Sequence, residues 1–256
     1  MKKFIVALLA LLLVLGCAPS IPPNSVTQTS TIDALLAGVY DGEMTCGELL
    51  RYGDLGIGTF DRLDGEMVIL DGIVYQVRSD GGVYRPAAAT RTPFATVCRF
   101  GPEQTVPLTQ KLDFAGLRRV LDTHIPDPHR FYAFRITGQF SKMRTRSVPA
   151  QQKPYPVLAE VAKTQPEFEM TDISGTIVGF RCPSFVKGIN VPGYHLHFLS
   201  ADRRKGGHIL GFELVSGCAE IGAGNRFMLI MPKKSEQLNR LDLSRDRSAE
   251  LERVEK

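Results

Sequence analysis

One short stretch of the sequence decides how the second half of the chain folds: Tyr194-His195-Leu196-His197-Phe198. Alternation at this spacing is typical of a strand that covers a core with one face. Successive side chains on a strand point to opposite faces, so the two imidazoles share one face and the other three side chains share the opposite face. The pattern therefore predicts a strand that presents two histidines to the same space.

A third histidine opens the next run. The turn at residues 201–207 separates the first strand from a second alternating segment that begins at His208, which predicts an antiparallel hairpin. Paired residue numbers in such a hairpin have a constant sum. If that sum is odd, His208 faces the same side as the other two histidines. With Ser200 opposite Lys205, for example, His208 lies directly across from His197.

Three histidines placed in this way can bind one metal ion. Cross-strand Cβ atoms about 5 Å apart bring imidazole nitrogens within zinc-binding range, about 2.0–2.1 Å from the ion. Three protein ligands leave a coordination position open, which is the catalytic arrangement. A His-x-His pair alone is more often a surface or core feature, and the third histidine is what favours a metal. His124 and His129 stand beside prolines and are interpreted as structural or solvent-exposed.

The rest of the chain is predicted to be rich in strands. Alternating or β-rich runs predict strands at residues 66–70, 73–78, 92–100, 131–140, 174–180, 194–200, 208–216 and 226–231. Helical periodicity is sparse and predicts short helices at residues 114–124, 157–162 and 248–255. We therefore expect a β-dominated α+β protein with two sheet layers, joined near the proline-rich stretch at residues 149–156.

The N-terminus has the layout of a secretory signal. Two lysines precede 12 apolar residues, 4–15, which are too few to span a bilayer, where about 20 are needed. Leu15-Gly16-Cys17 resembles a bacterial lipobox, and ordinary cleavage nearby, for example after Ala18, is the alternative. We expect residues 1–16 to be a signal peptide, Cys17 to be lipidated, and residues 17–29 to be a flexible tether. The protein would then be exported, as a cell-surface or periplasmic lipoprotein or a secreted protein, and would meet a membrane only through its lipid.

Composition and length limit the partners and the domain organisation that we expect. Removal of the signal peptide leaves 240 residues and lowers the formal charge from +4 to +2. No cluster of lysine and arginine is dense enough to neutralise a row of phosphates, which argues against a nucleic-acid partner. We expect a β-rich domain at residues 30–148, a second β domain with the hairpin at 149–234, and a charged tail at 235–256. By composition alone that tail would be frayed.

Four cysteines remain after the signal peptide: Cys46, Cys98, Cys182 and Cys218. None of them forms a CxxC pair, and their wide spacing does not make a small disulfide-stapled scaffold. Four cysteines allow three pairings that a sequence cannot separate. We interpret them as mostly buried apolar residues and leave a structural disulfide open.

Two charged residues stand where a reaction could use them. Glu66 starts a strand that is otherwise apolar, and a partly desolvated carboxyl group near a metal could move protons. Arg146 follows a predicted strand, and its guanidinium could hold a substrate carboxylate by two parallel hydrogen bonds. By residue type alone, each is more often a surface charge.

Several motifs, in matching order along the chain, closely resemble those of the α-acetolactate decarboxylases. They are residues 30–42, Gly58-Thr59-Phe60, residues 63–67, Arg146-Ser147-Val148-Pro149, residues 175–180, residues 193–198 and residues 207–211. The resemblance runs from about Ser30 to the C-terminus. It implies a zinc enzyme that converts (S)-2-acetolactate to (R)-acetoin and carbon dioxide. It also implies a mixed N-terminal sheet, a smaller antiparallel C-terminal sheet with the metal site between them, and a homodimer.

The resemblance also assigns roles to residues. The zinc ligands of the family fall on His195, His197 and His208, its substrate-binding arginine on Arg146, its acid on Glu66, and a pocket-lining residue on Thr59. The family places a tail glutamate in the site, which here is Glu255 or, by the less favoured alignment, Glu252. The tail is therefore expected to fold back and dock.

The implied chemistry needs no organic cofactor, and no glycine-rich nucleotide loop follows a strand. Zinc would polarise the hydroxyl and carbonyl oxygens of the substrate and stabilise the enediolate left when carbon dioxide departs. Arg146 would orient the carboxylate. Glu66, with the tail glutamate, would deliver a proton to one face of the enediolate.

Two other functions remain open from the sequence. One is a lipoprotein that binds zinc or a small ligand and catalyses nothing, although a metal scavenger usually has a closed or histidine-rich site and this chain has only five histidines. The other is a different hydrolytic or lyase metalloenzyme on the same scaffold, because a fold alone does not determine the chemistry.

Overall fold

The computed structural model describes residues 21–255 of the chain. The predicted signal peptide and Cys17 lie outside the described residues. Within the described part of the chain, no helix has the length and apolar character that a membrane span requires.

The first sheet is mixed and has seven strands. Its order is β15-β1-β8-β3-β4-β5-β6. The strands are β15 (Phe227–Ile230), β1 (Val26–Thr29), β8 (Ala95–Cys98), β3 (Leu55–Thr59), β4 (Glu66–Leu70), β5 (Ile73–Val77) and β6 (Val83–Tyr84). Only β1 and β15 run parallel, and the other neighbours are antiparallel.

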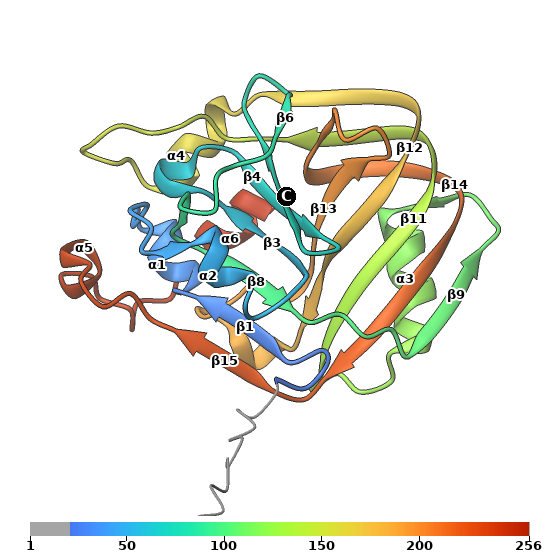
Figure 1. Cartoon of the computed structure of the whole chain (residues 1–256), viewed down its shortest axis with the longest axis horizontal. Coiled ribbons are helices and arrows are strands. Elements are labelled where there is room, and N and C mark those ends of the chain that lie inside the picture. The colour runs from blue at the N-terminus through green and yellow to red at the C-terminus, as the bar shows by residue number, and fades with distance from the viewer. Residues whose placement is uncertain (1–20, 256) are drawn as a thin grey trace, which may run out of the picture.

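The second sheet is antiparallel and is built from long strands (Figure 1). Its order is β10-β14-β11-β12-β13, and β9 pairs with β14. The strands are β9 (Gln104–Leu108), β10 (Leu112–Asp113), β11 (Phe131–Arg146), β12 (Glu167–Cys182), β13 (Gly193–Ser200) and β14 (Gly206–Gly224). Because β13 pairs with β12 and also with the start of β14, these strands curl round on one another.

The helices are short. They are α1 (Ile32–Leu36), α2 (Cys46–Leu49), α3 (Phe114–His124), α4 (Leu158–Val161), α5 (Glu236–Asn239) and α6 (Ser248–Glu255). Single 3₁₀ turns stand at η1 (Asp61–Leu63), η2 (Ala162–Thr164) and η3 (Ser184–Val186), and β2 (Met44–Thr45) pairs with β7 (Arg91–Thr92). Thr31 and Asp113 accept hydrogen bonds from main-chain N–H groups in the first turns of α1 and α3, which fixes where those helices begin.

The two sheets pack face to face, and helices cover their outer faces. Between the sheets, apolar side chains from β3 and β4 meet others from β12 and β13; they include Leu55, Ile57, Val68, Val178, Phe180 and Leu199. Leu117 and Leu121 of α3 pack on the opposite face of the second sheet, beside Phe198. Alternation along β4 places Met67 and Ile69 under α2, so Glu66 and Val68 point towards the second sheet.

The expected fold class is confirmed: the protein is β-dominated, with a mixed sheet, an antiparallel sheet and few short helices. The antiparallel sheet was expected to be the smaller one, but its strands are much longer than those of the mixed sheet. All eight predicted strand runs contain a strand, and the three predicted helical segments contain α3, α4 and α6. The predicted strands were shorter than β11, β12 and β14 are. Several elements were not predicted, among them β9, α1 and β3, whose glycines interrupt the alternation.

The end of the predicted tether differs from the expectation. Val26–Thr29 form β1, which is buried between β15 and β8 rather than flexible. Two neighbouring strands supply hydrogen bonds on both sides, and this long-range pairing outweighs the polar local sequence. The predicted division at residue 148 stays a prediction. Strand β11 belongs to the second sheet, while β15 returns to the first.

The four cysteines outside the predicted signal are all free thiols. Cys46, Cys98 and Cys182 are buried among apolar side chains, and Cys218 is half-buried. The interpretation of these residues as mostly buried is confirmed.

Candidate active site

The hairpin of β13 and β14 has the register that brings its histidines together. His197 pairs with His208, and the N–H of Ser200 donates to the carbonyl of Lys205 at 2.9 Å. Leu196 and Phe198 point away, into the core under α3. The expectation that the three histidines share one face is confirmed.

The three imidazoles converge on a single point between the sheets. One ring nitrogen from each of His195, His197 and His208 lies within 4.8 Å of the other two, and the ring centroids are 5.1–5.3 Å apart. Nδ1 of His197 is 2.9 Å from the carbonyl oxygen of Met67, which leaves its Nε2 to face the other rings. That Nε2 is buried and has no hydrogen-bond partner among the described residues.

Burial keeps the three histidines neutral. It lowers the pKa of His195 to about 3, and it holds the pKa values of His197 and His208 well below the ordinary 6.5. The positive charge of Arg146 lowers all three further. Neutral imidazoles with converging lone pairs are the form that binds a divalent cation, so these residues fit a metal ion.

Arg146 lies in the same cross-strand row as two of the histidines. It pairs with His208, which pairs with His197, so these three residues stand side by side on β11, β14 and β13. A β-bulge in β14 after His208 shifts the register between Arg144 and Thr145 and so sets this alignment. Arg146 is 4% exposed.

One side of the guanidinium of Arg146 is held by a neighbour. Its Nη1 donates to Oε1 of Gln165 at 2.6 Å, and its Nε has no hydrogen-bond partner among the described residues. A buried arginine with one fixed and one free side is arranged to receive an anion.

Glu66 faces the histidines from the first sheet. Its Oε2 is 3.7 Å from Nε2 of His197, and it pairs across β3 and β4 with Thr59, whose hydroxyl donates to the carbonyl of Gly65 at 2.8 Å. Burial raises the pKa of Glu66 from 4.5 to about 7, which Glu255 reinforces and Arg146 opposes. A carboxyl group with this pKa can give or accept a proton near neutral pH.

The C-terminal helix α6 brings the tail glutamate to the site. Oε2 of Glu255 is 4.0 Å from Nε2 of His195 and 3.9 Å from Nε2 of His208. Burial raises the pKa of Glu255 to about 7. Glu252, the less favoured alignment, lines a different cavity on the outside of α6. The tail is docked and not frayed, since Val254 is buried with side chains of α1 and α4.

These groups surround a small cavity of about 40 Å³. Its polar lining is Thr59, Glu66, Arg146, His195, His197, His208 and Glu255. The rest is mainly apolar and includes Ile32, Leu35, Leu63, Phe94, Leu158 and Val254. The structure thus brings every residue of the predicted site to one place, while His124 and His129 lie outside it.

Comparison with known proteins assigns the family. Residues 26–245 match the family model described as alpha-acetolactate decarboxylase. The chain belongs to the alpha-acetolactate decarboxylase family. It is 45% identical over 229 residues to the family member from Methanosarcina mazei, covering 90% of this chain and 79% of the relative. It is 39% identical over 218 residues to the one from Bacillus subtilis, covering 85% of this chain and 86% of the relative.

Solved structures of the alpha-acetolactate decarboxylase family share the fold. The enzyme from Bacillus subtilis strain 168 superposes with a TM-score of 0.88 at 37% identity, covering 90% of this chain and 99% of the other. A Staphylococcus aureus protein described as similar to alpha-acetolactate decarboxylase gives 0.85 at 33% identity, covering 90% and 98%. The match to the family model ends at residue 245, before α6, so the position of Glu255 is known here from the structure.

Two groups that hold site residues in place were not predicted from the sequence. The carbonyl of Met67 holds the ring of His197, and Gln165 holds Arg146. A main-chain carbonyl has no signature in the sequence, and Gln165 lies in a polar connection with no periodic pattern. Nothing in the sequence alone could have found either one.

Proposed function

We propose that this protein decarboxylates (S)-2-acetolactate to (R)-acetoin and carbon dioxide, with a zinc ion held by His195, His197 and His208. The observation that carries the proposal is the meeting of these neutral imidazoles with a buried arginine and a protonatable carboxyl group around one small cavity. Membership of the alpha-acetolactate decarboxylase family supports the choice of substrate.

Zinc is the metal we propose because three imidazole nitrogens are one of its common catalytic ligand sets. When bound there, it supplies Lewis-acid stabilisation of negative charge that develops on the oxygens of the substrate. The lone pair of Nε2 of His197, buried without a partner among the described residues, would be satisfied by the ion.

Arg146 binds the substrate carboxylate in this proposal. Its Nε is free and its Nη1 is held by Gln165, so the guanidinium is oriented before the substrate arrives. The carbon–carbon bond to the carboxylate breaks, carbon dioxide leaves, and the electron pair stays on the remaining fragment as an enediolate. Thr59 lines the pocket beside this group and helps to shape it.

Glu66 supplies the proton that takes the place of the departed carboxylate. Because burial raises its pKa to about 7, a useful fraction of Glu66 is protonated at neutral pH. It faces the cavity from the first sheet, opposite the strands that carry the histidines, and so reaches one face of the enediolate. Protonation from one side gives one enantiomer of acetoin. Glu255 lies on α6, next to His195 and His208, and assists in this protonation.

The test is incubation of the purified mature protein with racemic acetolactate, with and without a chelator. We expect release of carbon dioxide and formation of a single acetoin enantiomer, loss of both on chelation, and recovery with zinc. Bound zinc without carbon dioxide release would instead support a non-catalytic zinc- or small-ligand-binding lipoprotein. Turnover of other substrates only would indicate a different metalloenzyme.

We further infer that the protein is exported and anchored through a lipid on Cys17, and that it forms a homodimer. The support for export and anchoring is the charged start, the short apolar run and the Leu15-Gly16-Cys17 motif. Mass spectrometry of the N-terminal peptide tests lipidation, with Cys17→Ala as the control. Light scattering of the soluble mature chain tests the dimer.

A further inference from the structure

The proposed active site is too small, as it stands, for its substrate. The cavity of about 40 Å³ has room for about three water molecules. Sites that bind whole small molecules are commonly about 300–1,000 Å³. The functional side chains around it are buried, since His197 is 1% exposed and Glu66 is 7% exposed. A five-carbon acid can therefore reach the histidines only if part of the wall moves.

Helix α6 is held less firmly than the strands of the wall. The strands of the wall, β3, β4, β11, β13 and β14, are tied by main-chain ladders on one or both sides. Helix α6 is the last described element, and only Val254 and Leu251 pack it against the apolar cluster of α1 and α4. Lys187 and Asp246 form an exposed ion pair at its N-terminal end, with a distance of 2.9 Å. Elements with few buried contacts open first.

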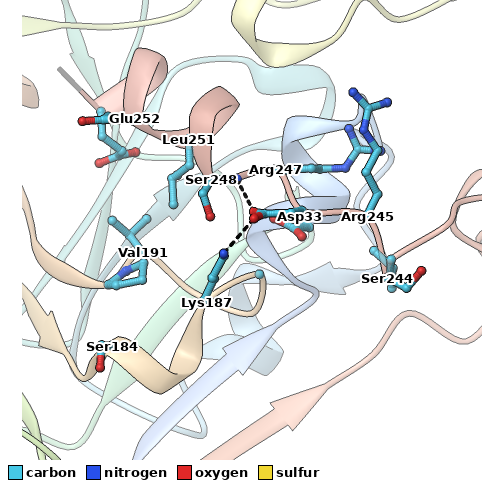
Figure 2. A pocket seen from close by; sticks show the side chains of 15 residues that line it. Asp33, Ser184, Lys187, Val191, Ser244, Arg245, Arg247, Ser248, Leu251 and Glu252 are labelled. Atoms are coloured by element: carbon cyan, nitrogen blue, oxygen red, sulfur yellow. Dashed lines mark hydrogen bonds and ion pairs between the residues drawn. The ribbon is translucent and has the colours of Figure 1, made fainter.

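A larger cavity lies on the outer side of α6. It has a volume of about 630 Å³ and is shown in Figure 2, where Ser248, Leu251 and Glu252 of α6 face Lys187, Val191 and Ser184. Among the described residues, Glu255 alone lines both this outer cavity and the inner one. The side chain of Glu255 is thus the partition between the two.

On the opposite side of α6, the inner cavity is closed off by a more strongly packed side chain. A groove of about 410 Å³ lies there, between α6 and α4, and Val254 lines both this groove and the inner cavity. Val254 is 4% exposed and packs in the apolar cluster, so withdrawing it would expose apolar surface. Withdrawing the carboxyl group of Glu255 towards the outer cavity, whose lining includes Lys187, Arg245 and Arg247, removes no apolar side chain from the cluster. Access from the side of Glu255 is therefore favoured.

We propose that α6 is a gate and that the outer cavity is the antechamber through which the substrate enters. When α6 lifts, Glu255 leaves the histidines and the two cavities become one space. When α6 returns over the bound acid, it stops short of the position seen here, because the acid needs more space than the inner cavity now offers; the acid then lies between α6, Arg146 and Glu66, and bulk water is excluded. The inference rests on the proposed function, because that function places the reaction in the inner cavity.

The first experiment narrows the antechamber. Ser184 is exposed, lines the outer cavity and has no part in the proposed chemistry, so Ser184→Trp obstructs the path. We expect kcat/KM to fall by about fivefold or more with kcat nearly unchanged, because capture of the substrate is slowed. Glu160→Trp is the matched control, since Glu160 is exposed and lines the groove on the other side of α6. Wild-type kcat/KM in Ser184→Trp, or an equal loss in Glu160→Trp, would overturn the assignment of the antechamber.

The second experiment holds the gate shut. Arg253 of α6 and Lys163 of η2 are both exposed and line the groove between α6 and α4. In the double variant Arg253→Cys/Lys163→Cys, a short reducible bis-maleimide would tether α6 to η2. We expect turnover to fall by about tenfold or more on tethering and to recover on reduction.

The control variant tethers α4 to η2 and leaves α6 unlinked. Glu160→Cys/Lys163→Cys shares one cysteine with the test variant and replaces an exposed ion pair with a distance of 2.7 Å. The same reagent should leave its turnover unchanged, which also accounts for reaction at native cysteines. Full turnover by the tethered test variant, with metal content unchanged, would overturn the gate.

Failure of the gate proposal can be distinguished from failure of the proposed function. An untethered, zinc-loaded protein that releases no carbon dioxide would refute the proposed function. In that case native-state hydrogen exchange still tests the gate. We expect the amides of α6 to exchange faster than those of β11 and to slow on tethering. Exchange in α6 as slow as in β11 would refute the gate independently of catalysis.

Discussion

Single residues of the site are buried at a cost to stability. Nε2 of His197 and Nε of Arg146 have no hydrogen-bond partner among the described residues. A buried polar atom without a partner costs about 1–3 kcal/mol. Two carboxyl groups with raised pKa values share the same cavity. A metal ion and an acidic substrate would complete these unmet interactions, which gives the arrangement a functional reason.

Loss of one imidazole should abolish the metal site. In His197→Ala, the ligand that Met67 orients is removed, and two imidazoles from different strands cannot hold the ion in the same geometry. We expect both bound zinc after dialysis and kcat/KM to fall, the latter by about 100-fold or more. His129→Ala, at an exposed position, should change neither. Zinc content and activity like those of wild type would remove His197 from the ligand set.

Loss of Glu66, the proposed proton donor, should leave the metal in place. Glu66→Gln keeps the shape of the side chain but cannot release a proton at neutral pH. We expect zinc content to be unchanged while kcat falls by about 10²–10⁴-fold, the usual contribution of general acid–base catalysis. Elemental analysis and steady-state kinetics on the same preparation would check both. Normal kcat would show that another group supplies the proton.

At the scale of elements, the site depends on how closely β14 approaches β11. Gly207 has φ = +128°, and a Cβ placed there would lie 2.5 Å from the carbonyl oxygen of Arg146. Glycine therefore allows β14 to pair with β11 while His208 stands beside both Arg146 and His197. The bulge that follows, between residues paired with Arg144 and Thr145, completes the alignment.

Substitution of this glycine should disturb both the fold and the site. We expect Gly207→Ala to lower the free energy of unfolding by about 1–3 kcal/mol, because the backbone conformation is strained and the strands must separate. Bound zinc should fall with it, since His208 is the next residue. Gly211→Ala is the control on the same strand, where a Cβ would meet nothing within 4 Å. Urea denaturation of the two variants gives the comparison, and equal stability would refute this role of Gly207.

At the scale of the whole molecule, five ionisable groups lie between the two sheets and link stability to pH. The three histidines have folded pKa values below 6.5, so the stability that they contribute is present above pH 6.5 and is lost as the pH falls. Glu66 and Glu255 act in the opposite direction. Their pKa values of about 7 exceed the ordinary 4.5, so their contribution is lost as the pH rises from 4.5 to 7.

In the chelator-treated protein, the effect of the three histidines on the free energy of unfolding should exceed the opposite effect of the two glutamates. Three protons taken up on unfolding oppose two released, so we expect these groups to lower the free energy of unfolding by about 1 kcal/mol per pH unit as the pH falls from 6.5 to 4.5. The double variant Glu66→Gln/Glu255→Gln removes the opposing term and should give a steeper dependence. Urea titrations at several pH values measure both slopes. A shallower slope in the double variant would contradict this sign.

Patterns of neighbouring residues were enough to predict part of the fold and of the site. The alternation around His195 and His197 is a property of neighbouring residues, and it correctly predicted a strand, its face and the partner His208. The same kind of evidence failed for β3, where Gly56 and Gly58 interrupt the pattern because β8 approaches closely. It also failed at Val26–Thr29, a polar segment whose strand exists only because β15 and β8 lie on either side.

By itself, the sequence determined the strand-rich class, the hairpin and the shared face of its histidines, because alternation with a period of two acts over a few residues. Its motifs also pointed to Glu66 and Arg146. Tertiary structure alone decided that these groups meet around one small cavity, that Gln165 and the carbonyl of Met67 orient them, and that Glu255 rather than Glu252 reaches the histidines. Those contacts join segments far apart in the chain, and they form only when the two sheets pack and exclude water from the space between them.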